Sequence, residues 1–231
     1  MAKKTLGIIG GMGPLATVYF FNKIVELTPA SSDQEHIPAV IINDVLVPDR
    51  TQYILDNTKP CPLPRLLDDI KKLEKCGADC IAIPCNTTHY FYEEMKKETS
   101  LPIINILDST LSAVCADGKS HKTAILATSG TLKSEIYTKA AKKYPIETYV
   151  PEKAICDKVT QMIYNQVKMG KPCEPEEFYS VIDAVLSAGC DSVVLGCTEL
   201  SVIYGDTGIR KDYIFDSTEL LAKSCVKFCC E

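Results

Sequence analysis

The sequence predicts an α/β protein of two similar lobes, each with a mostly parallel sheet flanked by helices and with an active-site cleft between the lobes. Strand-like apolar runs alternate with segments of helical periodicity, which is the signature of βαβ units and parallel sheets. The alternation then restarts near the middle of the 231 residues, with two sets of repeated motifs. The repeats indicate two copies of one structural plan.

The first half contains four β-branched runs of strand length, separated by segments in which apolar residues recur at helical spacing. The expected strands are 5–9, 39–44, 80–83 and 103–106, and the expected helices are 15–27, 65–76, 88–98 and 107–116. With a turn-like Asp117-Gly118-Lys119 next, these elements define a first lobe of residues 1–112.

The second half repeats the alternation over residues 113–209, the predicted second lobe. Its expected strands are 123–127, 147–150 and 192–195, and its expected helices are 132–143, 153–169 and 175–188. A final strand at 213–215 and a helix at 218–228 are expected to cross back, so that residues 210–231 complete the first lobe.

Two cysteines occupy equivalent places in one repeated phrase. Gly77-Ala-Asp-Cys-Ile-Ala-Ile-Pro-Cys85 aligns with Gly189-Cys-Asp-Ser-Val-Val-Leu-Gly-Cys197 at an offset of 112 (197 − 85). A second pair of segments, 7–13 and 124–130, aligns at an offset of 117 (124 − 7). Each thiol therefore follows a short buried strand, where open α/β sheets place their ligand chemistry.

Composition excludes several classes of function. The formal net charge of −5 argues against a nucleic-acid surface, and no apolar run is long enough to cross a bilayer. The charged, then glycine-rich start is a poor signal peptide, so we expect a cytoplasmic protein. Twelve cysteines without a Cys-x-x-Cys spacing predict no metal site. Cys225, Cys229 and Cys230 crowd the last expected helix without a catalytic context.

Several motifs along nearly the whole chain carry a resemblance to a known family. They are Gly10-Gly-Met-Gly-Pro14, Pro48-Asp49-Arg50, Pro84-Cys85-Asn86-Thr87-Thr88-His89, Ala127-Thr128-Ser129-Gly130-Thr131, Tyr164 with Lys168, and Gly196-Cys197-Thr198-Glu199. Through them the chain resembles the aspartate/glutamate racemase family, and most closely its aspartate racemase branch. The resemblance implies a homodimer that interconverts L- and D-forms of a small acidic amino acid, aspartate before glutamate, without a cofactor.

The two cysteines suit the chemistry that the resemblance implies. Inverting an α-carbon removes a proton from one face and delivers another to the opposite face, so two acid–base groups must flank the carbon. A thiol with a pKa near ~8.5 is easily shifted between thiol and thiolate. Cys85 and Cys197 are therefore the predicted catalytic pair, and by resemblance Cys85 serves the D-enantiomer and Cys197 the L-enantiomer.

The remaining candidates bind the substrate. Loss of the α-proton gives the α-carboxylate enolate character, which backbone amides and hydroxyls stabilise when they are preorganised. The candidates for that role are Met12, Asn86, Thr87, Thr88, Thr128, Thr131 and Thr198. The residues after each thiol are also expected to cap a helix start, which favours a thiolate.

Charged residues near these motifs are the candidates for the rest of the substrate. Arg50 is predicted to hold the side-chain carboxylate, with Lys168 adding charge to the same clamp and Asp49 orienting Arg50. Glu199 is expected to orient the substrate ammonium or to tune Cys197.

Other functions remain open on the sequence. Gly11-Met-Gly13-Pro-Leu-Ala16 followed by Asp44 fits a dinucleotide fingerprint, as in an NAD(P)-dependent oxidoreductase, although that hypothesis leaves both cysteine phrases unexplained. A non-catalytic amino-acid-binding protein and a broad-specificity racemase are further alternatives. So are the related family reactions, hydantoin racemisation and a decarboxylation that needs only one cysteine.

Overall fold

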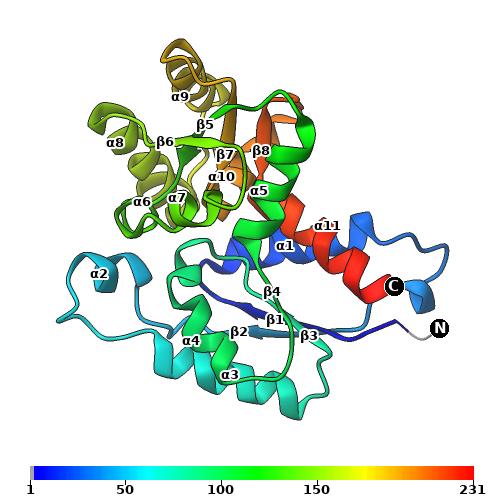
Figure 1. Ribbon diagram of the computed structural model, residues 1–231. Coiled ribbons are helices and arrows are strands. Elements are labelled where there is room, and N and C mark those ends of the chain that lie inside the picture. Colours follow the sequence, from blue (N-terminus) through cyan, green and yellow to red (C-terminus); the bar gives the residue numbers. More distant parts are fainter. Residues whose placement is uncertain (1–2) are drawn as a thin grey trace. The chain divides into compact units, whose positions relative to one another are not determined.

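The computed structural model describes residues 3–231 and contains two four-stranded parallel sheets flanked by helices (Figure 1). The strand orders are β2-β1-β3-β4 and β6-β5-β7-β8, so the two sheets share one topology. The predicted fold class, two similar α/β halves, is confirmed. Among the described residues, no helix is both long and apolar enough to span a membrane.

The chain forms two compact units, of which the first comprises residues 1–106 and 218–231. Its elements are β1 (Leu6–Gly10), α1 (Pro14–Leu27), the 3₁₀ helix η1 (Asp33–Glu35), β2 (Ala39–Asn43), α2 (Arg50–Leu55), α3 (Leu63–Lys75), β3 (Cys80–Ala82), the 3₁₀ helix η2 (Thr87–Phe91), α4 (Tyr92–Lys97), β4 (Ile103–Ile104) and α11 (Ser217–Cys230). Figure 1 shows α1 and α11 over one face of the first sheet and α3 with α4 over the other.

The second unit comprises residues 107–217. Its elements are α5 (Ile106–Asp117), β5 (Lys122–Leu126), α6 (Ser129–Ser134), α7 (Ile136–Ala141), β6 (Glu147–Tyr149), α8 (Lys153–Gln161), the π-helical segment η3 (Met162–Gln166), the 3₁₀ helix η4 (Val167–Met169), α9 (Pro175–Ser187), β7 (Ser192–Leu195), α10 (Thr198–Thr207) and β8 (Ile214–Asp216).

The register of the strands reproduces both sequence offsets. Leu6 of β1 lies opposite Cys80 of β3, and Thr123 of β5 lies opposite Ser192 of β7. Position 123 is 117 residues after 6, and 192 is 112 residues after 80. The repeats read from the sequence are therefore equivalent positions in the two sheets, and Cys85 and Cys197 leave their sheets at the same point.

Helix α3 shows how the apolar pattern builds the core of the first unit. Leu66, Ile70 and Leu73 recur at helical spacing and are fully buried against a cluster that includes Ile9 and Ile81 of the sheet. Burial of such a side chain contributes about 1.5–3 kcal/mol. This packing fixes the strands whose carboxyl ends carry the candidate site.

The last strand differs from the sequence expectation. β8 pairs with β7 in the second sheet, whereas residues 213–215 were expected to cross back to the first lobe. The β7-α10-β8 crossover is a standard parallel unit, so β8 pairs with the strand that precedes it. Only α11 returns to the first unit. The units divide at 106/107 and 217/218, compared with the sequence-based boundaries at 112/113 and 209/210.

Three expected helices are interrupted. The helix expected at 132–143 is divided into α6 and α7 by Glu135, the one described non-glycine residue with a positive φ, 58°. The helix expected at 153–169 changes to π-helical and then 3₁₀ geometry after Gln161, and the one at 88–98 begins as 3₁₀ helix η2. Hydrophobic periodicity does not register such changes of helix type.

Candidate active site

In each sheet, most candidate residues lie near the carboxyl ends of the two central strands, where the direction of the chain connections across the sheet changes. In the first sheet the chain passes from β1 outward to β2 and then returns to β3 on the other side of β1. The loops after β1 and β3 therefore leave the carboxyl edge side by side, at the point where such sheets bind ligands. The loops after β5 and β7 do the same in the second sheet.

Cys85 lies in the loop after β3 and is 6% exposed. Its backbone N–H donates to the carbonyl of Ile83, at 2.7 Å. Thr88 ties this loop to the β1 loop, because its hydroxyl donates to Met12 Sδ at 3.3 Å. The segment that follows is the short 3₁₀ helix η2, and Asn86 at its start makes no side-chain capping bond, contrary to expectation.

His89 holds the Cys85 loop against the start of α5. The backbone N–H of Ile106 donates to His89 Nε2 at 3.3 Å, so that nitrogen is an acceptor. Nδ1 then carries the proton and donates to the carbonyl of Cys85 at 3.0 Å. Both ring nitrogens therefore serve neutral backbone contacts.

Arg50 opens α2 and is buried, with 8% of its surface exposed. Its guanidinium donates to backbone carbonyls of Val47, Pro48 and Met12, at 3.4, 3.1 and 3.2 Å. Nε is buried and has no hydrogen-bond partner within the described chain, and no ion pair forms with Arg50 there. A buried cation held only by neutral carbonyls is suited to an anionic ligand.

Asp49 does not orient Arg50, contrary to the sequence expectation. Its carboxylate accepts from the backbone N–H of Gln52 at 2.8 Å and caps the start of α2. An aspartate immediately before a helix is a strong N-cap residue, and this local bond competes with pairing to the neighbouring guanidinium. The three carbonyls position Arg50 instead.

Asp44 supports the turn after β1. Its carboxylate accepts from Arg65 Nε at 2.5 Å and from the N–H of Leu46 at 2.9 Å, and the bond to Arg65 lowers the pKa of Asp44. The Asp44 backbone lies against Gly11, where an added Cβ would come within 2.4 Å of it. The acid considered for a ribose contact is thus engaged in holding Arg65.

Cys197 is buried at the start of α10, as its N-cap residue. Its Sγ donates to Glu199 Oε2 at 2.9 Å. Burial raises the pKa of Cys197 well above its usual value, and the Glu199 charge raises it further, while Lys168 opposes the shift. Cys197 is therefore a thiol at neutral pH, although a helix start was expected to favour the thiolate. Desolvation and an adjacent carboxylate outweigh the helix dipole here.

Lys168 reaches Glu199 from the distorted end of the α8 segment. Its Nζ lies 3.7 Å from Glu199 Oε1 and 4.9 Å from the centre of the Tyr164 ring. Both Tyr164 and Lys168 follow the onset of the π-helical turn, which changes the direction of side chains relative to a regular helix. Lys168, Glu199 and Cys197 form a continuous chain of contacts, in which the link between Glu199 and Cys197 was expected and the link between Lys168 and Glu199 was not.

The threonines of the second unit are buried around the same loops. Thr128 caps α6, accepting from the N–H of Thr131 at 3.2 Å and donating to its hydroxyl at 3.1 Å. Thr198 follows the thiol, and its hydroxyl lies 3.5 Å from Glu199 Oε2. Hydroxyls thus lie on both loops at the carboxyl edge of the second sheet.

Tyr137 is a residue of this region that sequence reasoning missed. It is 2% exposed, and its ring lies so close to Gly196 that a Cβ there would stand 3.2 Å from Cε2. Burial raises its pKa, opposed by bonds to Thr110 and Ser217. A tyrosine in a helix is usually a packing residue, so its own pattern does not mark Tyr137 as functional. The one hint is Gly196, the glycine before Cys197, which leaves room for the ring.

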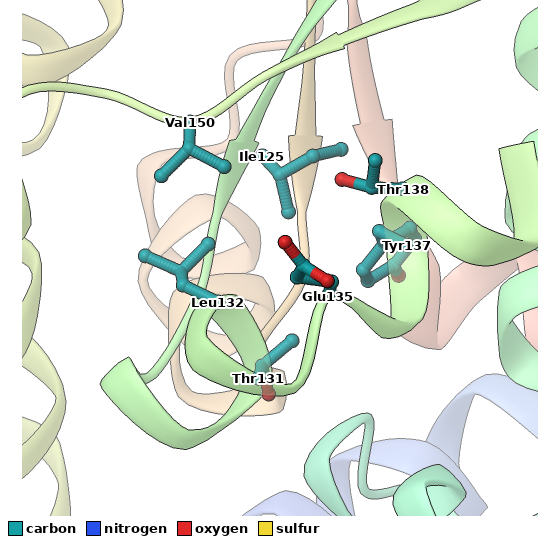
Figure 2. Close-up of a pocket in the computed structure, with 7 residues that line it drawn as sticks. All are labelled: Ile125, Thr131, Leu132, Glu135, Tyr137, Thr138 and Val150. Carbon is teal, nitrogen blue, oxygen red and sulfur yellow. The ribbon is translucent and has the colours of Figure 1, made fainter.

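A small hollow lies beside α6 and α7 in the second unit (Figure 2). Its lining residues are Ile125, Thr131, Leu132, Glu135, Tyr137, Thr138 and Val150. Its volume of about 10 Å³ leaves room for about one water molecule. It is too small to hold an amino acid.

Within residues 3–231, no group of three or more His, Cys, Asp or Glu side chains is arranged to hold a metal ion. The first unit carries a thiol and a buried guanidinium, and the second unit carries a thiol and a carboxylate with a lysine.

Comparisons with known proteins identify the family of the chain. The family model for Asp/Glu/hydantoin racemase matches residues 9–225. The broad specificity amino-acid racemase RacX of Bacillus subtilis (strain 168) is 29% identical over 226 residues, covering 96% of this chain and 96% of RacX.

Solved structures of racemases have a similar fold. The Picrophilus torridus aspartate racemase is 32% identical, with a TM-score of 0.81 over 98% of this chain and 94% of that one. A glutamate racemase from Francisella tularensis subsp. tularensis SCHU S4 shares the fold, with 17% identity and a TM-score of 0.69 over 98% and 81% of the two chains. Because the family model spans both repeats and both thiol loops, the chain belongs to the Asp/Glu/hydantoin racemase family.

Proposed function

We propose that the protein is a cofactor-independent racemase that inverts the α-carbon of an acidic amino acid, aspartate before glutamate, with Cys85 and Cys197 as the two bases. The observation that carries this proposal is the equivalence of the thiols. Both are buried, and both follow the third strand of a four-stranded sheet of the same topology. A reaction that needs one acid–base group on each face of a carbon accounts for a thiol in each repeat.

The contacts of Cys197 assign its role. Cys197 is protonated and donates to Glu199, so it is the acid that delivers a proton to the α-carbon. Cys85 is then the base for the first proton removal. By family resemblance, the enantiomer that presents its α-proton to Cys85 is the D-form.

Glu199 also bears on the reverse direction, in which Cys197 must lose its proton and remove the α-proton of the L-form. Its negative charge raises the pKa of Cys197, so a substrate ammonium next to Glu199 would offset that charge and ease loss of the thiol proton. Lys168 holds the other carboxylate oxygen of Glu199 at 3.7 Å. Substrate binding and activation of Cys197 are thereby linked through one carboxylate.

Arg50 is the proposed partner of the substrate's side-chain carboxylate. It is buried and bound only to neutral carbonyls, so a carboxylate would supply the missing countercharge. The α-carboxylate is assigned to the loops after the strands. Its proposed ligands are Met12, Asn86, Thr87, Thr88, Thr128, Thr131 and Thr198.

Broad specificity is the second candidate. RacX, which is described as a broad specificity amino-acid racemase, matches this chain along nearly its whole length. One methylene in a binding site changes affinity by only about 1–3 kcal/mol, so aspartate and glutamate differ little for a site of this kind.

A substrate panel distinguishes these candidates. The purified, metal-stripped protein is incubated without cofactor with L-aspartate, L-glutamate, L-alanine and L-lysine, and the D-product is measured by chiral chromatography. The proposal expects D-aspartate first. No inversion of any amino acid would refute the racemase assignment, and equal rates on all four would favour broad specificity.

Arg50→Ala tests the carboxylate clamp in the same assay. We expect kcat/KM for aspartate to fall by about 10- to 150-fold, because a charge-assisted bond is worth about 1.5–3 kcal/mol, while a neutral substrate loses less. Arg50→Lys, which keeps the charge but not the paired donors, should recover part of the loss. An equal loss on acidic and neutral substrates would remove Arg50 from the clamp.

The assembly also stays a prediction. We propose a homodimer, in keeping with the family resemblance, and the first unit has an apolar surface available for it. Leu15 and Val18 of α1 and Ile41 of β2 are exposed, at 52%, 58% and 40%. Light scattering of the purified protein measures the mass directly, and a monomer at micromolar concentration would contradict the proposal.

A further inference from the structure

Two buried thiols meet at the opposite end of β3 from Cys85. The Sγ atoms of Cys80 and Cys229 lie 3.7 Å apart, and the residues are 0% and 1% exposed. Cys80 opens β3, and Cys229 lies in the last turn of α11. A disulfide needs its sulfurs about 2 Å apart, so these two atoms would have to approach by less than ~2 Å.

The pattern of α11 explains why Cys229 faces inward. Leu221, Ala222, Cys225 and Cys229 recur at helical spacing and are all buried, whereas Cys230 is exposed. Lys4 fastens this end of the helix. Its backbone N–H donates to the carbonyl of Cys229 and its Nζ to that of Phe228, each at 3.1 Å.

The contact gives the two sulfurs different characters. The hydrogen bond to Cys80 lowers the pKa of Cys229, and the nearby Lys4 charge adds to that effect. The same bond, with burial, raises the pKa of Cys80. Cys80 thus keeps its proton and Cys229 is the more thiolate-like sulfur, which is the division of roles found between a resolving and an attacking cysteine.

Access is provided by the last turn of α11. Cys229 lies in that turn beside the exposed Cys230, and the end turns of helices open far more often than the core does. Opening of this single turn would expose Cys229 without disturbing the sheet.

We propose that Cys80 and Cys229 are a redox site that a hydroperoxide converts into a disulfide and that thiols reopen. The Cys229 thiolate attacks a peroxide oxygen; the O–O bond breaks, and protonation of the leaving oxygen gives water and a sulfenic acid. The Cys80 thiol then attacks the Cys229 sulfur, the S–S bond forms, the S–O bond breaks and a second water leaves. In sum, two thiols and one hydrogen peroxide give one disulfide and two waters.

The bond would have a structural consequence. It would join residues 80 and 229, and the loop so closed contains all of the second unit, residues 107–217. Closing a long loop restricts the unfolded chain, so the oxidised protein should melt several degrees higher than the reduced protein. This site does not depend on the proposed racemisation.

Peptide mapping tests the proposal on the full chain. Reduced protein is treated with one equivalent of hydrogen peroxide, its remaining thiols are alkylated, and it is cut without reduction by trypsin and an Asp-specific protease. Cleavage before Asp79 separates Cys76 from Cys80, and cleavage after Lys227 separates Cys225 from Cys229. Fragment ions distinguish Cys80 from Cys85 and Cys229 from Cys230. We expect one cross-link, between Cys80 and Cys229, that dithiothreitol removes together with the rise in melting temperature.

Matched variants complete the test. The cross-link should disappear in Cys80→Ala and in Cys229→Ala, and persist in Cys76→Ser and Cys230→Ser, whose side chains are exposed. A bond through Cys230 instead, a cross-link that forms only in urea, or a melting temperature that oxidation does not raise would overturn the proposal. The mapping of the unmodified chain decides the matter even if a variant fails to fold.

Discussion

The Cys197 thiol donates to a buried carboxylate, and that contact distinguishes it from Cys85. Burial and Glu199 keep Cys197 protonated, while Lys168 opposes them from the far side of the carboxylate. At Cys85 the neighbouring ring is His89, which serves two backbone groups. Equivalent positions in the two repeats therefore carry unlike chemistry, as a site that handles mirror-image substrates requires.

The pKa of Cys197 should respond in opposite directions to its two neighbours. Glu199→Gln removes a negative charge, so the pKa of Cys197 should fall. Iodoacetamide should then react faster with Cys197 at pH 8, by about tenfold for each pKa unit. Lys168→Met removes the opposing positive charge, so the pKa should rise and the reaction should slow. The measurement is the alkylation rate against pH, followed at Cys197 by peptide mass spectrometry.

Cys190 is an internal control for that experiment. Burial also raises its pKa, but its charged neighbours are Lys122, Asp191 and Glu147. Its alkylation profile should be the same in all three proteins. If both substitutions moved the Cys197 midpoint in the same direction, the proposed balance between Glu199 and Lys168 would be wrong.

Sequence reasoning located residues better than it located their partners. The thiols and the threonines were expected in the segments after strands because of their phrases, and the structure has them there. Their roles in a site stay predictions, as does the role of Arg50. The pairing of Lys168 with Glu199, and the capping role of Asp49, depend on a π-helical turn and on a local hydrogen bond. Neither leaves a periodic signal in the sequence, so both were missed.

Among the elements, the turn between β1 and α1 is the most constrained. Gly11 has a φ of 89°, and a side chain there would meet the Asp44 backbone at 2.4 Å. The next residue, Met12, supplies a carbonyl to Arg50. The shape of this turn therefore sets the position of the buried guanidinium.

Gly11→Ala measures that constraint against a matched control. Gly77 also has a positive φ, 77°, but nothing lies within 4 Å of an added Cβ. Gly77→Ala should lower the free energy of unfolding by about 1–2 kcal/mol, the cost of a left-handed alanine. Gly11→Ala should lower it by that amount and by about 1–3 kcal/mol more, because the added Cβ overpacks against Asp44. Urea unfolding gives both values, and equal losses would contradict the tight packing of Gly11 on Asp44.

Helix existence was easier to predict than helix type. The apolar stripe of α3 was read correctly because its spacing is regular and its face is fully buried. The division of 132–143 into α6 and α7 depends on Glu135 adopting a left-handed conformation, which a glutamate rarely does. No glycine or proline marks the break.

For the whole molecule, the sequence offsets correctly predicted two sheets of one topology. The ends of the repeats were predicted only in part: the return of the last helix to the first unit was expected, whereas β8 stays in the second sheet and α5 lies mostly in the second unit. α5 follows β4 but lies mostly in the second unit, and α11 follows β8 but lies mostly in the first, so each repeat contributes its last helix to the other unit.

The central claim is a two-base inversion shared by the repeats, and deuterium incorporation tests it most directly. L-Aspartate is incubated with the enzyme in heavy water, and the α-position of both enantiomers is followed at low conversion. A two-base reaction puts solvent deuterium into every D-aspartate formed and leaves the remaining L-aspartate protonated at its α-carbon.

The thiol variants complete that measurement. Cys85→Ser and Cys197→Ser should each lower inversion by about 100-fold or more, because a serine hydroxyl is a far weaker acid than a thiol. The account predicts deuterated product, unlabelled substrate and inactive single variants. Product that retains the original proton, or near-normal inversion by either variant, would contradict it.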